Sequence, residues 1–501
     1  MHKQAELILN WKKSKGTISP MLYGHFAEHI GGVFYDGIWV GEDSPIENIH
    51  GFRKAFIESF RKLHPPVLRW PGGCFAETYD WRDGIGPREK RPRRAGWWYY
   101  EDRRVETNQV GTHEFMELCR LVGAKPYIAA NMTTTTPLSI RNWMEYCNLP
   151  AGETTLSDER AANGSPEPFG VEYWGIGNEN WGGGGHMTPE KCVQEYLRYS
   201  TVCRSLGLPE QKYILCGANG HDYAWTRRVM QECRAQLGTE APAWGLGTHY
   251  YCQTAGTPQN FTGEQWYQQL FQADRMREII QNHRAAMEEF DPDCRMGLVI
   301  DEWGCWHQEG TGPSKGRNLF EQQSTMRDAM VAALTLNLFN NSCDVVWMAN
   351  VAQLCNNLHS LYLAGGEHLA ETPNYHVFHM FQTHMGARQI HTEVNCETLQ
   401  EDGFRPLETL SASVSETAER ITLTLANLDR ENPQCVRLLD ADGQCTGSGT
   451  MTILQHEDLH ACNTFEAPRT VVPVQRPITL AKGGSVEVPP AGIVSIVLKK
   501  S

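Results

Sequence analysis

Short apolar runs alternate with longer segments of helical periodicity through the first three quarters of the chain. The apolar runs, rich in β-branched and aromatic residues, cover residues 21–26, 67–72, 125–132, 173–179, 213–219, 244–251, 297–303 and 345–351. Apolar residues at helical spacing mark segments 52–63, 112–121, 190–206, 222–237, 263–290, 319–340 and 374–385. The pattern predicts an α/β fold, a (β/α)8 TIM barrel enlarged by loop insertions.

A doubly wound open sheet is the alternative arrangement for alternating strands and helices. It usually carries a glycine-rich phosphate fingerprint after its first strand. Two Gly-x-Gly pairs, at 175–177 and 245–247, lack a third glycine at the required spacing. We therefore interpret both pairs as tight packing within strands and favour the barrel.

The pattern changes after residue 388. Alternating stretches at 420–427, 485–488 and 492–498, separated by Gly, Pro, Asp and Asn, are typical of a C-terminal antiparallel β-sandwich of jelly-roll type. Residues 6–10 precede the first barrel strand, and we expect them to add a strand to the β-sandwich. We expect two domains, a catalytic barrel at 18–388 and a β-sandwich formed by 1–17 plus 389–501.

Composition and charge narrow the classes of partner. The chain has 501 residues, 41% of them apolar, and a formal charge of −14. An acidic chain is a poor match for nucleic acid or an anionic membrane, so a neutral or weakly charged substrate fits better. No apolar run is long enough to span a bilayer, and the first residues lack a secretory apolar stretch. Sixteen cysteines without a Cys-x-x-Cys pair indicate reduced thiols and a cytoplasmic location.

Two carboxylates stand at the ends of predicted strands. Glu179 ends the fourth apolar run and Glu302 ends the seventh. In a barrel both would lie at the C-terminal face, where active sites form. Two carboxyl groups across such a mouth are what cleavage of a glycosidic bond requires, one as acid and one as nucleophile. A solvated surface position is the alternative for any single glutamate, but the flanking apolar strands argue against it.

Several motifs in register resemble one enzyme family. They are GHFAEH at 24–29, LRWPGG at 68–73, DGIGP at 83–87, GIGNEN at 175–180, IDEWG at 300–304 and NVAQL at 350–354. Together they are similar to the α-L-arabinofuranosidases of glycoside hydrolase family 51, along nearly the whole chain. The resemblance implies a retaining glycosidase with its two catalytic carboxylates on strands 4 and 7.

The resemblance also implies residue roles. Glu179 corresponds to the general acid/base and Glu302 to the nucleophile, with Asn178 contacting the sugar 2-hydroxyl. The other matching substrate-binding positions are Glu28, Arg69, Cys74, Tyr251 and Gln353. From the sequence alone, Glu28 and Arg69 could equally form a structural ion pair, and Tyr251 could be a core aromatic. Cys74 stands where some members have Asn, and a thiol is a weaker hydrogen-bonding group.

The segment 88–104 mixes six arginines and one lysine with four adjacent aromatics. Such interleaving suits stacking on nucleic-acid bases, but the acidic chain favours another role. We expect Trp97, Trp98 and Tyr99 to bind a sugar chain beyond the cleaved bond or to contact a neighbouring subunit. A solvated loop pinned by its aromatics is the simpler alternative.

These observations predict an exo-acting, retaining α-L-arabinofuranosidase that releases terminal non-reducing arabinofuranose from arabinoxylan or arabinan oligosaccharides. The alternatives are a β-glycosidase of the same family type, such as an endoglucanase or xylosidase, and a catalytically silent carbohydrate-binding protein. We expect no cofactor and no metal site, because segment 113–119 lacks the second histidine of a zinc helix and neither retaining hydrolysis nor the family resemblance calls for a metal. The family resemblance further implies a homo-oligomer, a hexamer in bacterial members.

Overall fold

Eight parallel strands close into a barrel in this protein, whose structure is a computed structural model that describes residues 3–253, 255–308 and 311–500. The barrel runs in the order β2, β5, β8, β9, β10, β11, β12, β13. These strands are Gly24–Phe26, Val67–Trp70, Lys125–Ala130, Tyr173–Ile176, Lys212–Leu215, Gly245–Gln253, Gly297–Trp306 and Val346–Ala352. Each lies within or overlaps one of the eight predicted runs, so the barrel prediction is confirmed.

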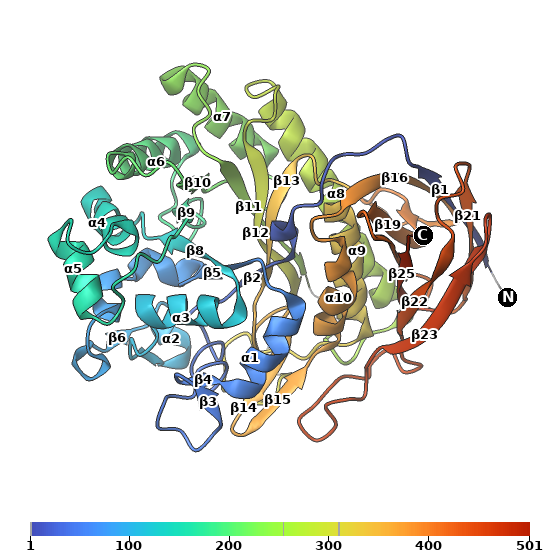
Figure 1. Ribbon diagram of the computed structural model, residues 1–501, viewed down its shortest axis with the longest axis horizontal. Coiled ribbons are helices and arrows are strands. Elements are labelled where there is room, and N and C mark those ends of the chain that lie inside the picture. The colour runs from blue at the N-terminus through green and yellow to red at the C-terminus, as the bar shows by residue number, and fades with distance from the viewer. Residues whose placement is uncertain (1–2, 254, 309–310, 501) are drawn as a thin grey trace. The chain divides into compact units, whose positions relative to one another are not determined.

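Helices follow the barrel strands along the chain. They are α1 (Lys54–Phe60), α2 (Tyr99–Asp102), α3 (Thr112–Val122), α4 (Pro137–Asn148), α5 (Thr155–Ala162), α6 (Pro189–Arg204), α7 (Tyr223–Leu237), α8 (Gly263–Glu288), α9 (Met326–Asn340) and α10 (Pro373–Phe381). In Figure 1, α6 lies beside both α4 and α7, outside β9 and β10. The helices α4 and α5 were not predicted.

Local signals explain where the helices begin. Thr136 and Thr188 each stand before a proline, and each side chain accepts a hydrogen bond from the backbone N–H of the residue three positions later. Helix α9 begins at Met326, later than predicted. There Thr325 and Asp328 form a reciprocal capping box, which fixes the first turn.

A nine-stranded, mostly antiparallel sheet follows the barrel in sequence, as predicted for the C-terminal part. Its order is β23-β22-β25-β20-β19-β16-β1-β21-β24. The strands are β1 (Lys3–Asn10), β16 (Arg388–Asn395), β19 (Leu410–Glu416), β20 (Arg420–Asn427), β21 (Gln434–Asp440), β22 (Gly447–Leu454), β23 (Val474–Leu480), β24 (Ser485–Val488) and β25 (Ile493–Lys499). Alternate residues of these strands share one hydrophobic core.

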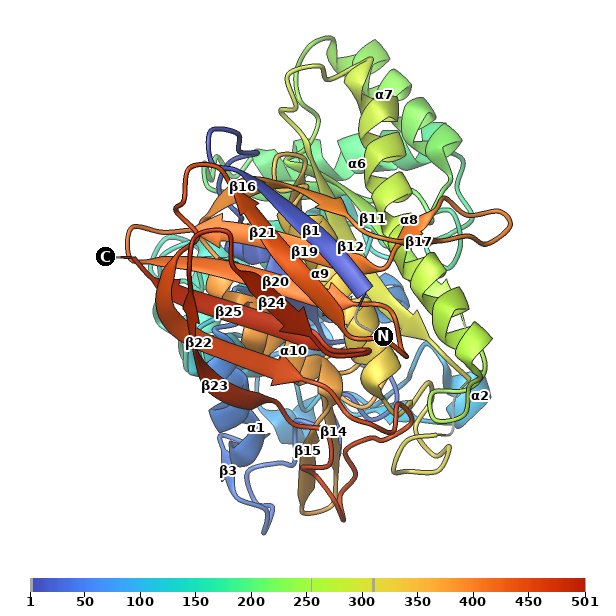
Figure 2. The same ribbon diagram turned by 90° about the vertical axis from the view of Figure 1, so that its right-hand side faces the viewer.

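Strand β1, near the start of the sequence, pairs with two strands of the C-terminal part of the chain. It pairs antiparallel with β16 and parallel with β21, and Figure 2 shows it lying between them. Its buried positions Ala5, Leu7 and Leu9 alternate with more exposed ones, which is the period of a strand with one face in a core.

Short two-stranded hairpins decorate the loops. They are β3 (Asn48–Ile49) with β4 (Phe52–Arg53), β6 (Arg94–Ala95) with β7 (Val105–Glu106), β14 (Tyr362–Gly365) with β15 (His368–Glu371), and β17 (Thr398–Leu399) with β18 (Leu407–Glu408). The β6–β7 hairpin closes the loop that carries Trp97, Trp98 and Tyr99.

Contacts divide the chain into two compact units. One contains Met1–Tyr23, Tyr251–Ile280 and Trp303–Ser501, and the other contains Gly24–Tyr250 and Gln281–Glu302. Both candidate catalytic glutamates belong to the second unit, so their geometry can be described within it.

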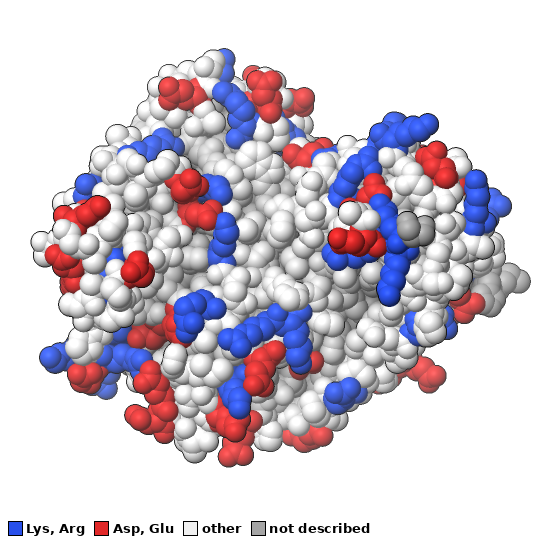
Figure 3. All heavy atoms as spheres, in the orientation of Figure 1, with Lys and Arg blue, Asp and Glu red and all other residues white. Residues whose placement is uncertain are grey.

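Charged side chains of both signs are interspersed on the face presented in Figure 3. Among the described residues, no helix combines the length and the apolar character that crossing a membrane requires.

Candidate active site

A sharp turn after β9 carries Glu179. The strand ends at Ile176, and Gly177 has φ of 86°, a conformation that favours glycine. Glu179 itself has φ of 43°, in the left-handed region that non-glycine residues rarely adopt. The carboxylate therefore stands three residues beyond the strand rather than at its last position.

The glycines after Glu179 allow close backbone approach. The backbone N–H groups of Gly182 and Gly184 donate to the Glu179 carbonyl oxygen at 2.7 and 3.0 Å. A Cβ atom on Gly184 would lie 1.9 Å from the carbonyl oxygen of Asn178. The segment therefore forms a tight turn around the backbone of Glu179.

Glu302 lies inside β12 and is only 6% exposed. Arg69 from β5 donates to it, with Nη1 at 2.7 Å from Glu302 Oε1. The other terminal nitrogen of Arg69 lies 2.7 Å from Asn178 Oδ1. One guanidinium thus bridges the residue before Glu179 and the second carboxylate.

Arg69 remains charged although it is buried. Burial lowers its pKa, but the charges of Asp301 and Glu302 more than offset this and raise the pKa above its usual range. Its guanidinium also lies 4.6 Å from the centre of the Phe26 ring. The positive charge of Arg69 therefore lies in direct contact with the Glu302 carboxylate.

His249 connects the two carboxylates. Its Nδ1 lies 2.9 Å from Glu179 Oε1 and 3.5 Å from Glu302 Oε2. One carboxylate oxygen of Glu179 lies within 4.8 Å of one of Glu302, and both lie within that distance of His249. Burial lowers the pKa of His249, but the charges of Glu302 and Glu179 outweigh burial, so its pKa is raised. These three groups could also ligate a cation.

Asp301 directly precedes Glu302 in β12 and is buried. Tyr127 in β8 donates its hydroxyl to Asp301 Oδ1 at 3.0 Å. A Cβ atom on Gly175 would lie 2.7 Å from that hydroxyl oxygen, so the glycine makes room for Tyr127. Burial raises the pKa of Asp301, which Arg69 and His249 partly counteract.

A further buried carboxylate, Glu77, orients the residue before Glu179. It accepts hydrogen bonds from the backbone N–H groups of Asn178 at 2.6 Å, Met132 at 3.1 Å and Thr133 at 2.9 Å. Burial raises the pKa of Glu77 to about 7, although these donors lower it. Sequence reasoning missed Glu77, His249 and Tyr127. For His249, its place in the HYY run at 249–251, at the end of a predicted strand, was the available signal.

The turn at residues 71–74 lies against Glu28 and carries Cys74. Glu28 Oε1 accepts the backbone N–H of Phe75 at 3.0 Å, and a Cβ atom on Gly73 would lie 2.8 Å from that oxygen. Cys74 donates its S–H to Glu179 Oε2 at 3.7 Å. Burial, and next the charge of Glu179, raise the pKa of this thiol, so Cys74 is a neutral donor with a polar contact of its own.

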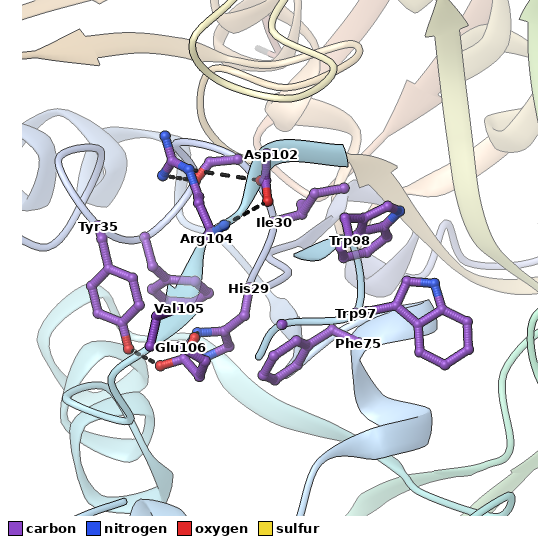
Figure 4. Close-up of a pocket in the computed structure, with 13 residues that line it drawn as sticks. His29, Ile30, Tyr35, Phe75, Trp97, Trp98, Asp102, Arg104, Val105 and Glu106 are labelled. Atoms are coloured by element: carbon purple, nitrogen blue, oxygen red, sulfur yellow. Dashed lines mark hydrogen bonds and ion pairs between the residues drawn. The ribbon is translucent and has the colours of Figure 1, made fainter. Parts of the chain in front are cut away.

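The loop between β6 and β7, which carries Trp97, Trp98 and Tyr99, lines a small pocket. Trp97 and Trp98 line it together with His29 and Phe75 (Figure 4). Glu106, at the end of the loop, pairs with His29 Nδ1 at 2.9 Å and accepts the Tyr35 hydroxyl. The loop is therefore anchored by buried polar contacts, and Trp97 reaches Gly183, where a Cβ atom would lie 3.5 Å from its ring.

The arginines of segment 88–104 pair mostly with carboxylates. Arg88 and Arg91 contact Glu114 at 3.0 and 2.9 Å, and Arg94 contacts Asp83 at 2.7 Å. Their charges are thus largely satisfied within the chain. Tyr99 is 36% exposed and has Arg103 over its ring.

Two predicted residues belong to the other compact unit. Tyr251 lies in β11 with its ring 5.1 Å from that of Trp306. Gln353 directly follows β13, is buried, and donates its backbone N–H to the Asn357 carbonyl oxygen at 3.2 Å. Their contact with substrate stays a prediction.

Family models match two stretches of the chain. Residues 59–206 match the alpha-L-arabinofuranosidase 1 domain and residues 301–491 match the alpha-L-arabinofuranosidase C-terminal domain. An intracellular exo-alpha-L-arabinofuranosidase of Bacteroides ovatus is 34% identical, over 99% of this chain and 96% of that protein.

Solved structures are similar along the whole chain. The GH51 arabinofuranosidase from Xanthomonas axonopodis pv. citri is 33% identical with a TM-score of 0.92, covering 99% of this chain and 100% of the other. The alpha-L-arabinofuranosidase from Thermotoga maritima, in a complex with arabinose, is 29% identical with a TM-score of 0.87 and the same coverage.

Proposed function

The chain belongs to the α-L-arabinofuranosidases of glycoside hydrolase family 51, and from this premise we propose that it cleaves terminal α-L-arabinofuranosides by a two-step retaining mechanism. Glu302 is the proposed nucleophile and Glu179 the proposed acid/base. The observation that carries the mechanism is their separation, since one oxygen of each carboxylate lies within 4.8 Å of the other. Retaining enzymes place these groups ~5 to 5.5 Å apart, against ~6.5 to 9.5 Å in inverting ones.

In the first step Glu302 attacks the anomeric carbon while Glu179 protonates the departing glycosidic oxygen. A covalent glycosyl-enzyme forms and the rest of the oligosaccharide leaves. In the second step Glu179 takes a proton from water, which attacks the same carbon and releases arabinose with its original configuration.

The neighbours of the two carboxylates fit these roles. Arg69, 2.7 Å from Glu302, keeps the nucleophile ionised and aimed. His249 and Cys74 both contact Glu179, and they hold its two oxygens in defined directions. Asn178, fixed by Arg69 and Glu77, is the group proposed to bind the 2-hydroxyl.

The substrates are proposed to be arabinoxylan- or arabinan-derived oligosaccharides, cut from the non-reducing end. Glu28, Tyr251 and Gln353 are proposed sugar contacts. The aromatic residues Trp97, Trp98 and Tyr99 are proposed to contact the chain beyond the cleaved bond. The nearness of Trp97 to the turn that holds Glu179 supports this placement.

Variants at the two glutamates test the mechanism. Glu302→Ala should abolish turnover of every arabinofuranoside, because no glycosyl-enzyme can form. Glu179→Ala should slow poor leaving groups far more than activated nitrophenyl ones, and azide should rescue it as a glycosyl azide of retained configuration. An azide product of inverted configuration would overturn the retaining mechanism.

A panel of nitrophenyl glycosides tests the substrate class. Activity on the α-L-arabinofuranoside alone is the expected result. Preference for a β-xyloside or β-glucoside would favour the β-glycosidase alternative, and turnover of none of them would favour a binding protein.

We also propose a cytoplasmic, hexameric enzyme. The name of the Bacteroides ovatus relative, which describes it as intracellular, supports the location. All sixteen cysteines are unbridged, as expected in a reducing compartment. Mass measurement of the purified chain at several concentrations checks the hexamer, and a stable monomer would contradict it.

A further inference from the structure

A second group of side chains of the types that bind metals lies inside the unit that contains the nine-stranded sheet. Cys305 lies in β12, Asp328 in the first turn of α9, and His359 in the loop after β13. The thiol sulfur, one carboxylate oxygen and one ring nitrogen all lie within 4.8 Å of one another. All three residues are at most 2% exposed.

His359 has no hydrogen-bond partner for either ring nitrogen among the described residues. Buried polar groups are nearly always bonded, so such a ring needs an explanation. The chain makes room for it, because a Cβ atom on Gly304 would lie 2.4 Å from the Cβ of His359. A neutral imidazole has one nitrogen lone pair that a cation could occupy.

Asp328 is already oriented. Its Oδ2 accepts from the Thr325 backbone N–H at 2.8 Å, and its Oδ1 lies 2.7 Å from His307 Nε2. A carboxylate oxygen can accept two bonds, so Oδ1 keeps a lone pair for another partner.

Cys305 supplies the remaining charge. Gln269 donates to its sulfur at 3.5 Å. A bound cation would displace the proton of the thiol. Cys305 and Asp328 would then bring two negative charges against one divalent cation, and the Arg327 guanidinium is a further positive charge that interacts with both. The nearby Arg327 bonds to the carbonyl oxygens of Ala255 and Thr257.

We propose that Cys305, Asp328 and His359 bind one Zn²⁺ ion. A thiolate, an imidazole and a carboxylate are the ligands zinc prefers, whereas Mg²⁺ and Ca²⁺ prefer oxygen alone. Water completes a tetrahedral set of four ligands. The ion joins β12, α9 and the loop after β13, so it stabilises this unit rather than taking part in glycoside cleavage.

Metal analysis of the tag-free, full-length chain tests the proposal. After removal of metal with a chelator and titration with Zn²⁺, we expect about one tightly held ion per chain and a higher unfolding temperature. With Co²⁺, a thiolate-to-metal absorption band should appear. Cys305→Ser should lose the band and the bound ion.

Matched variants separate the site from general effects of losing a thiol. Cys445, 2% exposed in the core of the sheet, provides the control, and Cys445→Ser should keep the ion. His307→Asn should weaken zinc binding ~10- to 100-fold, because His307 orients the ligand Asp328. Wild-type protein that binds no ion, or Cys305→Ser that binds as wild type, would overturn the proposal. Variants are compared only where circular dichroism shows native folding.

Discussion

Arg69 contacts two groups of the proposed site with the two ends of one guanidinium. Its nitrogens lie 2.7 Å from Glu302 Oε1 and 2.7 Å from Asn178 Oδ1. A lysine would keep the charge but offers a single ammonium on a flexible stem, so it cannot hold both partners in this geometry.

Arg69→Lys should therefore lower kcat/KM by ~10²-fold or more, the range seen when one positioned donor is lost. The measurement is hydrolysis of a nitrophenyl α-L-arabinofuranoside, with thermal unfolding to check the fold. Arg120→Lys is the control, because its side chain is 67% exposed and should leave the rate unchanged. A loss of less than twofold in Arg69→Lys would show that the bridge is not needed.

His249 links the site to pH through stability. Its pKa in the folded protein is raised above the usual ~6.5, because the charges of Glu302 and Glu179 outweigh burial. A raised pKa means that the folded state binds the proton more tightly than the unfolded state. The stabilisation is therefore full below pH ~6.5 and is lost as pH rises through the folded pKa.

We expect the difference in unfolding temperature between wild type and His249→Gln to be largest near pH ~5.5 and to shrink toward pH ~8.5. Thermal unfolding followed by circular dichroism at several pH values measures it. Exposed His50, paired with Glu117 at the surface, gives the comparison variant His50→Gln. A difference that grows with pH would mean that His249 is neutral in the folded state.

At the scale of residues, the catalytic roles of Glu179 and Glu302 stay a prediction. These two glutamates were recognisable in the sequence because a carboxylate at the end of an apolar run is unusual. Glu77 and Tyr127 were not, because their function is to bond other site residues across the barrel. The sequence shows that such residues are apolar-flanked, but it does not show which backbone N–H or carboxylate they meet.

At the scale of elements, strand β1 shows how residues near the start of the sequence pack into the nine-stranded sheet. Leu7 is fully buried in the core of the nine-stranded sheet, whereas its neighbour Ile8 is 37% exposed. The two residues have similar size and share one strand, so they differ only in the face they occupy.

Leu7→Ala should lower the free energy of unfolding by about 2–5 kcal/mol, since it removes buried methyl groups and leaves a cavity. Ile8→Ala should cost less than about 1 kcal/mol. Chemical denaturation of both variants measures the difference. Equal costs would mean that β1 does not belong to this core, and the proposed domain formed by residues 1–17 plus 389–501 would fail.

The barrel strands were predictable because eight apolar runs are short and each is bounded by turn residues. Helix boundaries were less so. The predicted helix at 319–340 began too early, since Leu319 and Phe320 were counted into its apolar period, although five polar residues follow them and the Thr325 capping box fixes the start. Helix α4 was missed although Thr136 and Pro137 form a start signal and Ile140, Trp143, Met144 and Cys147 follow at helical spacing.

At the scale of the whole molecule, the net charge of the chain should favour neutral over acidic oligosaccharides, even where the active site would accept both. The chain carries a formal charge of −14, while arabino-oligosaccharides are neutral. A neutral molecule gains nothing from the long-range field, so its encounter rate does not depend on ionic strength. An oligosaccharide that also carries a uronic acid is repelled by the same field.

We therefore expect kcat/KM for a neutral arabinoxylan oligosaccharide to change less than ~2-fold between ~0.02 and ~0.5 M salt, because screening acts only on charged pairs. For the same oligosaccharide with a glucuronic acid side group, kcat/KM should rise with salt as the repulsion is screened. Comparing the two substrates on one enzyme preparation cancels any direct effect of salt on the protein. If the uronate-bearing substrate were instead fastest at low salt, a local basic surface would outweigh the acidic whole, and the arginine-rich loop at 88–104 would be the first place to look. Equal, strong salt dependence for both would trace the effect to the active site rather than to the charge of the molecule.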